Sequence, residues 1–111
     1  MENIQWSDFE KVEMRVGTVI SAEPFPEARK PAIKLTIDFG ALGIKKSSAQ
    51  ITHYYSPETL VGRQVIAVVN FPPKQIGQFM SECLVLGNIE ADGKVVLLQP
   101  SQQTENGCRI A

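Results

Sequence analysis

The sequence predicts a single all-β domain, and three observations support this prediction. About six short segments rich in Val, Ile, Thr and Phe are separated by turn signals, a spacing typical of barrels and sandwiches. The alternation of strands and helices that marks a parallel α/β protein is missing. The 111 residues are 43% hydrophobic and 21% charged, a balance suited to one globular core. We therefore expect residues 1–111 to form one domain.

The first part of the chain predicts a short helix, a strand and a loop. Ser7-Asp8-Phe9-Glu10 has the form of a capping box, which predicts a helix near residues 8–12. Residues 14–22 alternate and contain many β-branched side chains, so we expect a strand there, bent or bulged at Gly17. Three prolines interrupt residues 23–31, which predicts a loop because proline cannot donate to a β-ladder.

The middle of the chain predicts two more strands and a second helix. Residues 32–39 place Ile33, Leu35, Ile37 and Phe39 on one face and polar side chains on the other, as in a half-buried strand. A turn at residues 40–43 leads to a weaker, polar strand over residues 44–51. Ser56-Pro57-Glu58 is typical of a helix start, and Gly62 ends that helix after one to two turns.

The last part of the chain predicts three strands. Residues 65–71 are strongly apolar, and residues 72–82 are irregular. Residues 83–89 and 94–98 are joined through Asp92-Gly93, a strong hairpin signal. A five-stranded barrel with a helix between the third and fourth strands is the OB pattern. The predicted fold is therefore an all-β OB-fold barrel, preceded by a short N-terminal helix.

Little in the sequence predicts catalysis. There is one histidine, His53, neither cysteine has a CxxC partner, and no glycine-rich phosphate loop is present. We expect no enzyme activity, no metal and no cofactor. Cys83 lies in an apolar run and is expected to be buried, whereas Cys108 is an incidental thiol. No signal peptide and no apolar run of ~20 residues are seen, so we expect a cytoplasmic protein without membrane insertion.

The charge distribution suggests a binding surface for phosphates. Residues 29–74 carry seven Lys or Arg and two acidic residues, although the whole chain has a net charge of −1. A local positive field attracts phosphates even on a neutral protein. A solvated charged surface is the alternative. His53, Tyr54 and Tyr55 lie beside this segment, and they either stack nucleobases or pack over the short helix.

A second candidate surface is apolar. Phe71, Ile76, Phe79 and Met80 crowd the irregular segment around residues 72–82. They either line an exposed groove for a partner chain or an extended peptide, or belong to a loop folded back onto the barrel.

Six pieces of sequence occur in an order that resembles the tRNA-binding domain family, over about residues 9–110. They are residues 14–19, 23–28, 33–40, 60–65, 70–77 and 81–87. The family includes stand-alone tRNA-binding dimers and appended domains of some methionyl-tRNA synthetases. Residues 70–87 look most like a bacterial branch of the family described as secretion-related chaperones. Unlike the family's usual cation-rich loop, residues 70–77 keep one cation, Lys74, and Glu82 follows.

The resemblance implies an OB fold, a homodimer, and tRNA or structured RNA as the partner. The alternative function is an export-related chaperone that binds unfolded precursor proteins, and the export motor, through the apolar groove. Asn70, Lys74 and Ser81 are carried over as RNA contacts, and the charge pattern alone adds Arg15, Lys34, Lys45 and Lys46. Phe71, Ile76, Phe79 and Met80 form the predicted peptide or dimer surface. Ile4, Trp6 and Phe9 are further dimer candidates, unless Trp6 and Phe9 plug one end of the barrel.

Overall fold

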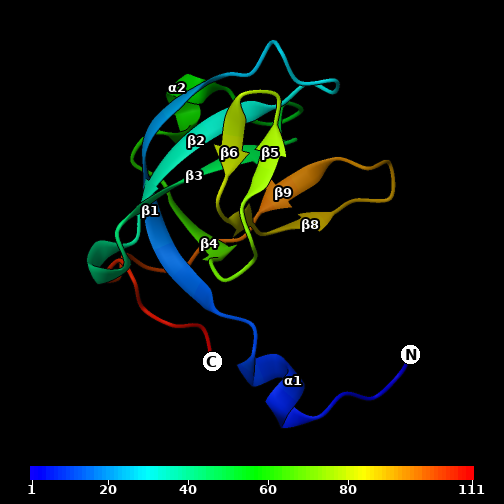
Figure 1. Ribbon diagram of the computed structural model, residues 1–111, viewed down its shortest axis with the longest axis vertical. Helices are drawn as coiled ribbons and strands as arrows, with labels where there is room; N and C mark the ends of the chain where they lie inside the picture. Colours follow the sequence, from blue (N-terminus) through cyan, green and yellow to red (C-terminus); the bar gives the residue numbers. More distant parts are fainter.

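Five antiparallel strands form a curved sheet that nearly closes into a barrel, in the computed structural model of residues 1–111 (Figure 1). Their spatial order is β3 (Ile44–Ala49), β2 (Ile33–Asp38), β1 (Met14–Pro24), β4 (Gln64–Val68) and β7 (Leu84–Val85). β1 pairs with β4 through its first half and with β2 through its second. The short helix α2 (Pro57–Leu60) lies between β3 and β4 in the chain. The predicted OB-like barrel is confirmed.

The alternation in β2 divides its side chains between the core and the outer face. Ile33, Leu35 and Ile37 are at most 2% exposed and join Phe39 in the core, as predicted. On the outer face, Lys34 lies opposite Ser48 of β3 and Thr36 lies opposite Lys46. Because successive side chains of a strand point to opposite faces, Lys45 shares the inner side with buried Ser47. Lys45 and Lys46 therefore point in opposite directions.

Gly17 is required by close packing rather than by a bulge. A Cβ at this position would lie 2.6 Å from Ile37 Cγ2 and 2.7 Å from the Phe39 ring. The irregularity of register falls three residues later, between Val19 and Ser21. The predicted strand is therefore correct, but its bulge was placed too early, because a glycine also appears wherever another side chain approaches the backbone.

The barrel closes where β3 meets the segment before β7, through a few hydrogen bonds instead of a ladder. The Glu82 amide donates to the Lys46 carbonyl at 2.7 Å, and the Lys46 amide donates to Glu82 Oε1 at 2.9 Å. Ser47 Oγ donates to the Cys83 carbonyl at 2.9 Å. Cys83 is buried, as predicted, and this burial raises the pKa of its thiol to about 11.

Residues 74–81 form a regular hairpin, so the prediction that residues 72–82 are irregular is wrong for most of that segment. β5 (Lys74–Ile76) pairs with β6 (Phe79–Ser81) across the two-residue turn Gly77-Gln78. Gly77 has φ 61°, which suits the first central position of such a turn. The hairpin lies against β3 in the connection between β4 and β7 (Figure 1). Two prolines and strands of three residues hid this pairing from pattern analysis.

The remaining elements are close to the predictions, with shifted ends. The apolar strand ends at Val68 rather than at residue 71, and residues 83–89 divide into β7 and β8 (Gly87–Ile89). β8 pairs with β9 (Val95–Leu97) through the predicted hairpin, and a short 3-10 turn spans Gly40–Leu42.

The N-terminal helix α1 (Trp6–Glu10) begins two residues earlier than predicted. Its cap is Gln5, whose amide donates to Asp8 Oδ2 at 2.9 Å, so the capping box does not start at Ser7. The helix projects away from the barrel and buries none of its residues (Figure 1). Trp6 is 83% exposed, so it does not plug the barrel end.

Candidate nucleic-acid interface

The candidate site is the outer face of β2 and β3, between two connections of the barrel. One is the β1–β2 loop, residues 25–32, and the other is the β5–β6 hairpin. In OB folds this face and these two connections bind oligonucleotides and other ligands. Two hollows lie along the hairpin, which we name the tip hollow, of about 520 Å³, and the base hollow, of about 550 Å³.

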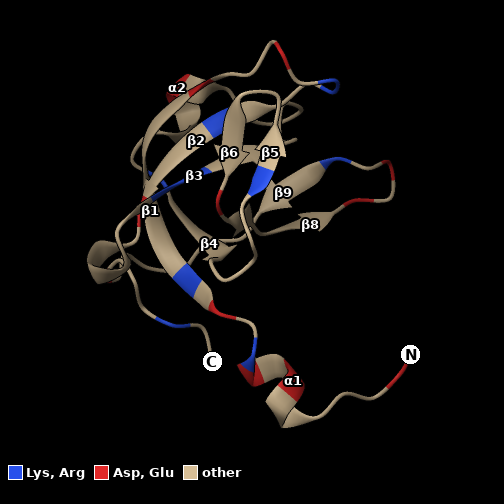
Figure 2. Cartoon of the chain, viewed as in Figure 1, with Lys and Arg blue, Asp and Glu red and all other residues tan.

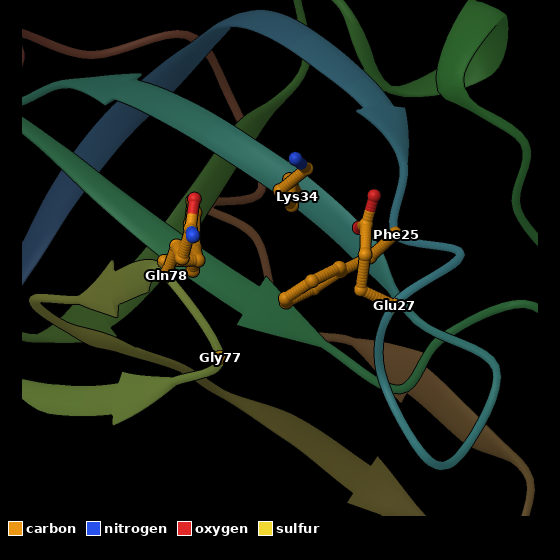
Figure 3. Close-up of a pocket in the computed structure, with 6 residues that line it drawn as sticks. Phe25, Glu27, Lys34, Gly77 and Gln78 are labelled. Carbon is orange, nitrogen blue, oxygen red and sulfur yellow. The ribbon is translucent and has the colours of Figure 1, made fainter.

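The tip hollow combines aromatic, cationic and polar groups (Figure 3). The rings of Phe25 and Phe79 meet edge to face, with centroids 5.3 Å apart. Lys34 Nζ lies 5.0 Å from the Phe25 centroid and 5.7 Å from that of Phe79. The same ammonium is 3.6 Å from Glu23 Oε1, whose side chain is 69% exposed. The hollow is completed by Glu27, Gly77 and Gln78.

The base hollow is lined more by apolar groups. Phe71 is 55% exposed and Leu84 is 50% exposed. Ser81 Oγ accepts a hydrogen bond from the Ser48 amide at 3.3 Å, which ties the hairpin to β3. The full lining consists of Ser48, Gln50, Phe71, Pro72, Lys74, Ile76, Ser81, Glu82, Cys83 and Leu84.

Three predicted RNA contacts, Lys34, Lys46 and Lys74, surround the hairpin. Lys34 lines the tip hollow and Lys74 the base hollow, whereas Lys46 lines a separate hollow with Met80 and Glu82. Figure 2 shows basic residues on β2, β3 and β5 around the hairpin. Lys46 and Lys74 are exposed and form no ion pair, and Lys34 holds only the long contact to Glu23. Lys45 belongs to the same segment but lies on the inner side of β3. Ser81 is at the base hollow.

Arg15 and Asn70 have partners within the fold. Arg15 binds the Glu13 carboxylate at 2.7 Å and donates to the Gly107 carbonyl at 3.1 Å. The hydrogen bond between the Arg15 guanidinium and the Glu13 carboxylate is the main cause that lowers the pKa of Glu13. Asn70 Oδ1 accepts from the Glu13 amide at 3.0 Å, and its Nδ2 donates to the Lys11 carbonyl at 2.7 Å. These side chains fix the path of the chain between α1 and β1.

The residues of the predicted apolar surface are distributed over different hollows along the hairpin. Phe71 and Ile76 line the base hollow, and Phe79 lines the tip hollow. Met80, 43% exposed, points to the other face of the hairpin, because it pairs with Gln75.

The aromatic cluster beside the basic segment has other partners. Tyr55 packs against the core, and its hydroxyl accepts from the Leu97 amide at 3.0 Å. Tyr54 donates to the Glu90 carboxylate, and this hydrogen bond raises the pKa of Tyr54. Tyr54 therefore contacts the β8–β9 hairpin, whereas the Tyr55 ring also lies 5.4 Å from the Arg63 guanidinium.

Phe25, Glu27 and Gln78 were not among the predicted site residues. Phe25 stands between two prolines in a segment predicted as a plain loop. A large apolar side chain in a loop was the signal that could have identified Phe25 as a site residue. Gln78 could be assigned to the site only once the hairpin was known.

The structure contains neither a cluster of metal-binding side chains nor a membrane-spanning helix. No cluster of three or more His, Cys, Asp or Glu side chains could hold a metal ion. Neither α-helix combines the length and apolar character required to cross a membrane.

Known proteins match nearly the whole chain. The family described as "Putative tRNA binding domain" matches residues 14–109. The crystal structure of the chaperone CsaA from Bacillus anthracis is 55% identical, with a TM-score of 0.94, and covers 99% of this chain and 100% of that one. A CsaA chaperone protein from Picrophilus torridus is 52% identical, with a TM-score of 0.91, over 98% of this chain and 100% of that one. A MetRS related protein from Pyrococcus horikoshii is 32% identical, with a TM-score of 0.89, and all of both chains is covered.

Curated relatives are longer proteins. The methionine–tRNA ligase of Porphyromonas gingivalis is 36% identical over 109 residues, which are 98% of this chain. That of Chlorobium chlorochromatii is 38% identical over 104 residues, which are 94% of this chain. The matched region spans 16% and 14% of these two ligases. On the family match and these identities, the chain belongs to the tRNA-binding domain family.

Proposed function

We propose that this protein binds tRNA or structured RNA through the outer face of β2 and β3. The observation that carries the proposal is that Lys34 and Lys46 lie on that face and Lys74 lies on the adjacent hairpin, one of the two connections that bind ligands in OB folds. Double-stranded RNA is recognised mainly by its shape and through its phosphates and 2′-hydroxyls. Three ammonium groups on a shallow face suit that kind of contact. The proposal is a binding function and includes no reaction.

The acidic residue beside the hairpin has a structural role. The Glu82 carboxylate accepts a hydrogen bond from the Lys46 amide and so forms part of the barrel seam. Its position follows from closure of the barrel. The hairpin contributes a single cation, Lys74, so most of the positive charge at the face comes from the strands.

The base hollow supports a second function, that of an export-related chaperone. Its exposed Phe71 and Leu84 offer an apolar surface beside Ile76, which suits an extended apolar segment of an unfolded precursor protein. The likeness to two proteins named as CsaA chaperones supports the same proposal. The export motor would then be a further partner, and both functions place the protein in the cytoplasm.

One binding experiment tests both functions. Fluorescence anisotropy of labelled bulk tRNA is measured from low to physiological salt, with an unfolded precursor protein as the competitor. Three phosphate contacts predict that log K falls with log salt with a slope of about −2 to −3. Absence of tRNA binding at low salt would refute the RNA proposal. If the precursor itself is labelled, salt-insensitive binding to this protein would support the chaperone function. If the protein neither binds the precursor nor changes its aggregation, the chaperone function is refuted.

We also propose a homodimer formed through α1. Ile4 and Trp6 are 68% and 83% exposed, and together with Phe9 they line a shallow hollow of about 290 Å³. Exposed apolar side chains on a helix that leaves the barrel are expected to be covered by a partner. Light scattering across a concentration series should give twice the mass of one chain, and Trp6→Ser should shift it toward a single chain. A single-chain mass at every concentration contradicts the dimer.

A further inference from the structure

We propose that the tip hollow is a subsite for one unpaired nucleobase that carries an exocyclic amino group. The inference rests on the proposed RNA-binding function and specifies which part of the RNA enters the hollow. The side chains that surround this hollow are those of Phe25, Glu27, Lys34, Gln78 and Phe79.

The size and the aromatic lining of the hollow suit a single base. Its volume of about 520 Å³ lies within the range of small-molecule sites, ~300–1,000 Å³. Phe79 is only half-buried, and its ring is inclined by 60° to that of Phe25. A nucleobase can stack on such a ring because every base presents a π-face.

Lys34 can make room for the base. Its ammonium lies near the faces of both rings and is otherwise held by one long contact to the exposed Glu23 carboxylate. The ion pair is long and its Glu23 end is 69% exposed, so it stabilises the lysine only weakly and can be exchanged for a ligand. On binding, the base takes the place over the rings and the ammonium turns to the adjacent phosphate. Lys34 thus binds the RNA phosphate while the two aromatic rings contact the base.

Of the two polar side chains at the rim, Glu27 selects for an amino group. Glu27 is exposed and has no partner within the fold, and its carboxylate only accepts hydrogen bonds. The N4 amino group of cytosine donates to such a carboxylate. Uracil carries a carbonyl oxygen at the same position, which a carboxylate repels. The side-chain amide of Gln78 has both a donor and an acceptor, so it can hydrogen-bond to cytosine and to uracil and does not discriminate between them (Figure 3).

The probe is a pair of labelled RNA hexamers, oligo-C and oligo-U, bound to the full chain at low salt. The two ligands have equal charge and similar size, and they differ at the amino or carbonyl group that faces Glu27. We expect oligo-C to bind at least about fivefold more tightly, because the Glu27 carboxylate accepts a hydrogen bond from the amino group of cytosine but repels the carbonyl oxygen of uracil. Glu27→Gln should remove most of the preference, since its amide donates as well as accepts. The matched control Glu105→Gln makes the same chemical change at an exposed residue outside the hollow and should leave the preference intact.

A second variant tests the stacking. Phe79→Leu keeps an apolar side chain at the rim and should weaken both hexamers at least about fivefold, while the salt dependence of bulk tRNA binding is unchanged. Salt-sensitive tRNA binding with equal affinity for the two hexamers would overturn this inference and leave the proposed function intact. Failure to bind both tRNA and hexamers would overturn both. Circular dichroism of each variant establishes that it is folded.

Discussion

Replacing Lys34, Lys46 and Lys74 together with Glu should lower the affinity for bulk tRNA by about two orders of magnitude near physiological salt. Each substitution removes one contact to a phosphate and adds a charge that repels it. The salt slope of the remaining binding should fall toward zero, because the counterions released by these three contacts are no longer displaced. Anisotropy titrations of the variant and the wild type, at matched salt, give both quantities.

The neighbours Lys45 and Lys46 provide the matched control for this prediction. They differ in the face of β3 that they occupy, and only Lys46 lies on the outer face with Lys34. Lys46→Glu alone should weaken tRNA binding, and Lys45→Glu should change it much less. Equal losses in the two variants would mean that the bound RNA does not lie along the outer face. Urea unfolding of both variants shows whether either has lost stability.

Replacing Gly17 with Ala should lower the free energy of unfolding by about 1–3 kcal/mol. The new methyl group would approach Ile37 Cγ2 and the Phe39 ring to 2.6 and 2.7 Å. Both neighbours are fully buried, so neither can move without disturbing the core. The urea midpoint should therefore fall at constant slope.

Ser21→Ala is the control for the glycine. Ser21 lies on the same strand but is exposed, so its replacement should stay within about 0.5 kcal/mol of the wild type. An unchanged midpoint for the Gly17→Ala variant would mean that β1 can shift locally and that the close approach is not a constraint on the sequence.

Local chemistry made much of the fold predictable. The period of two in β2, the Ser-Pro start of α2 and the Asp-Gly turn between β8 and β9 each act within a few residues. All three features were placed within a residue or two of where the structure has them. The N-terminal helix was predicted two residues too late, because its cap is Gln5, which is a weaker N-cap residue than Ser7.

The candidate site was less predictable because it depends on contacts distant in the sequence. The charge pattern could not distinguish Arg15, which is held by Gly107 from the far end of the chain, from Lys46, which has no such partner. Likewise, the side-chain amide of Asn70 accepts through Oδ1 from residue 13 and donates through Nδ2 to residue 11. Strand register, which adjacent residues do not reveal, decides that Lys46 rather than Lys45 joins Lys34.

The strict alternation in β2 also bears on how this scaffold can change over evolution. The barrel depends for its stability on the buried side chains of Ile33, Leu35 and Ile37. The outward side chains, those of Lys34 and Thr36, face the candidate ligand site. Mutations at the outward positions can therefore alter ligand preference without perturbing the packing of the barrel. Two selective pressures act on one strand with little interference. A scaffold of this kind can acquire a new ligand by a few substitutions while its fold stays the same.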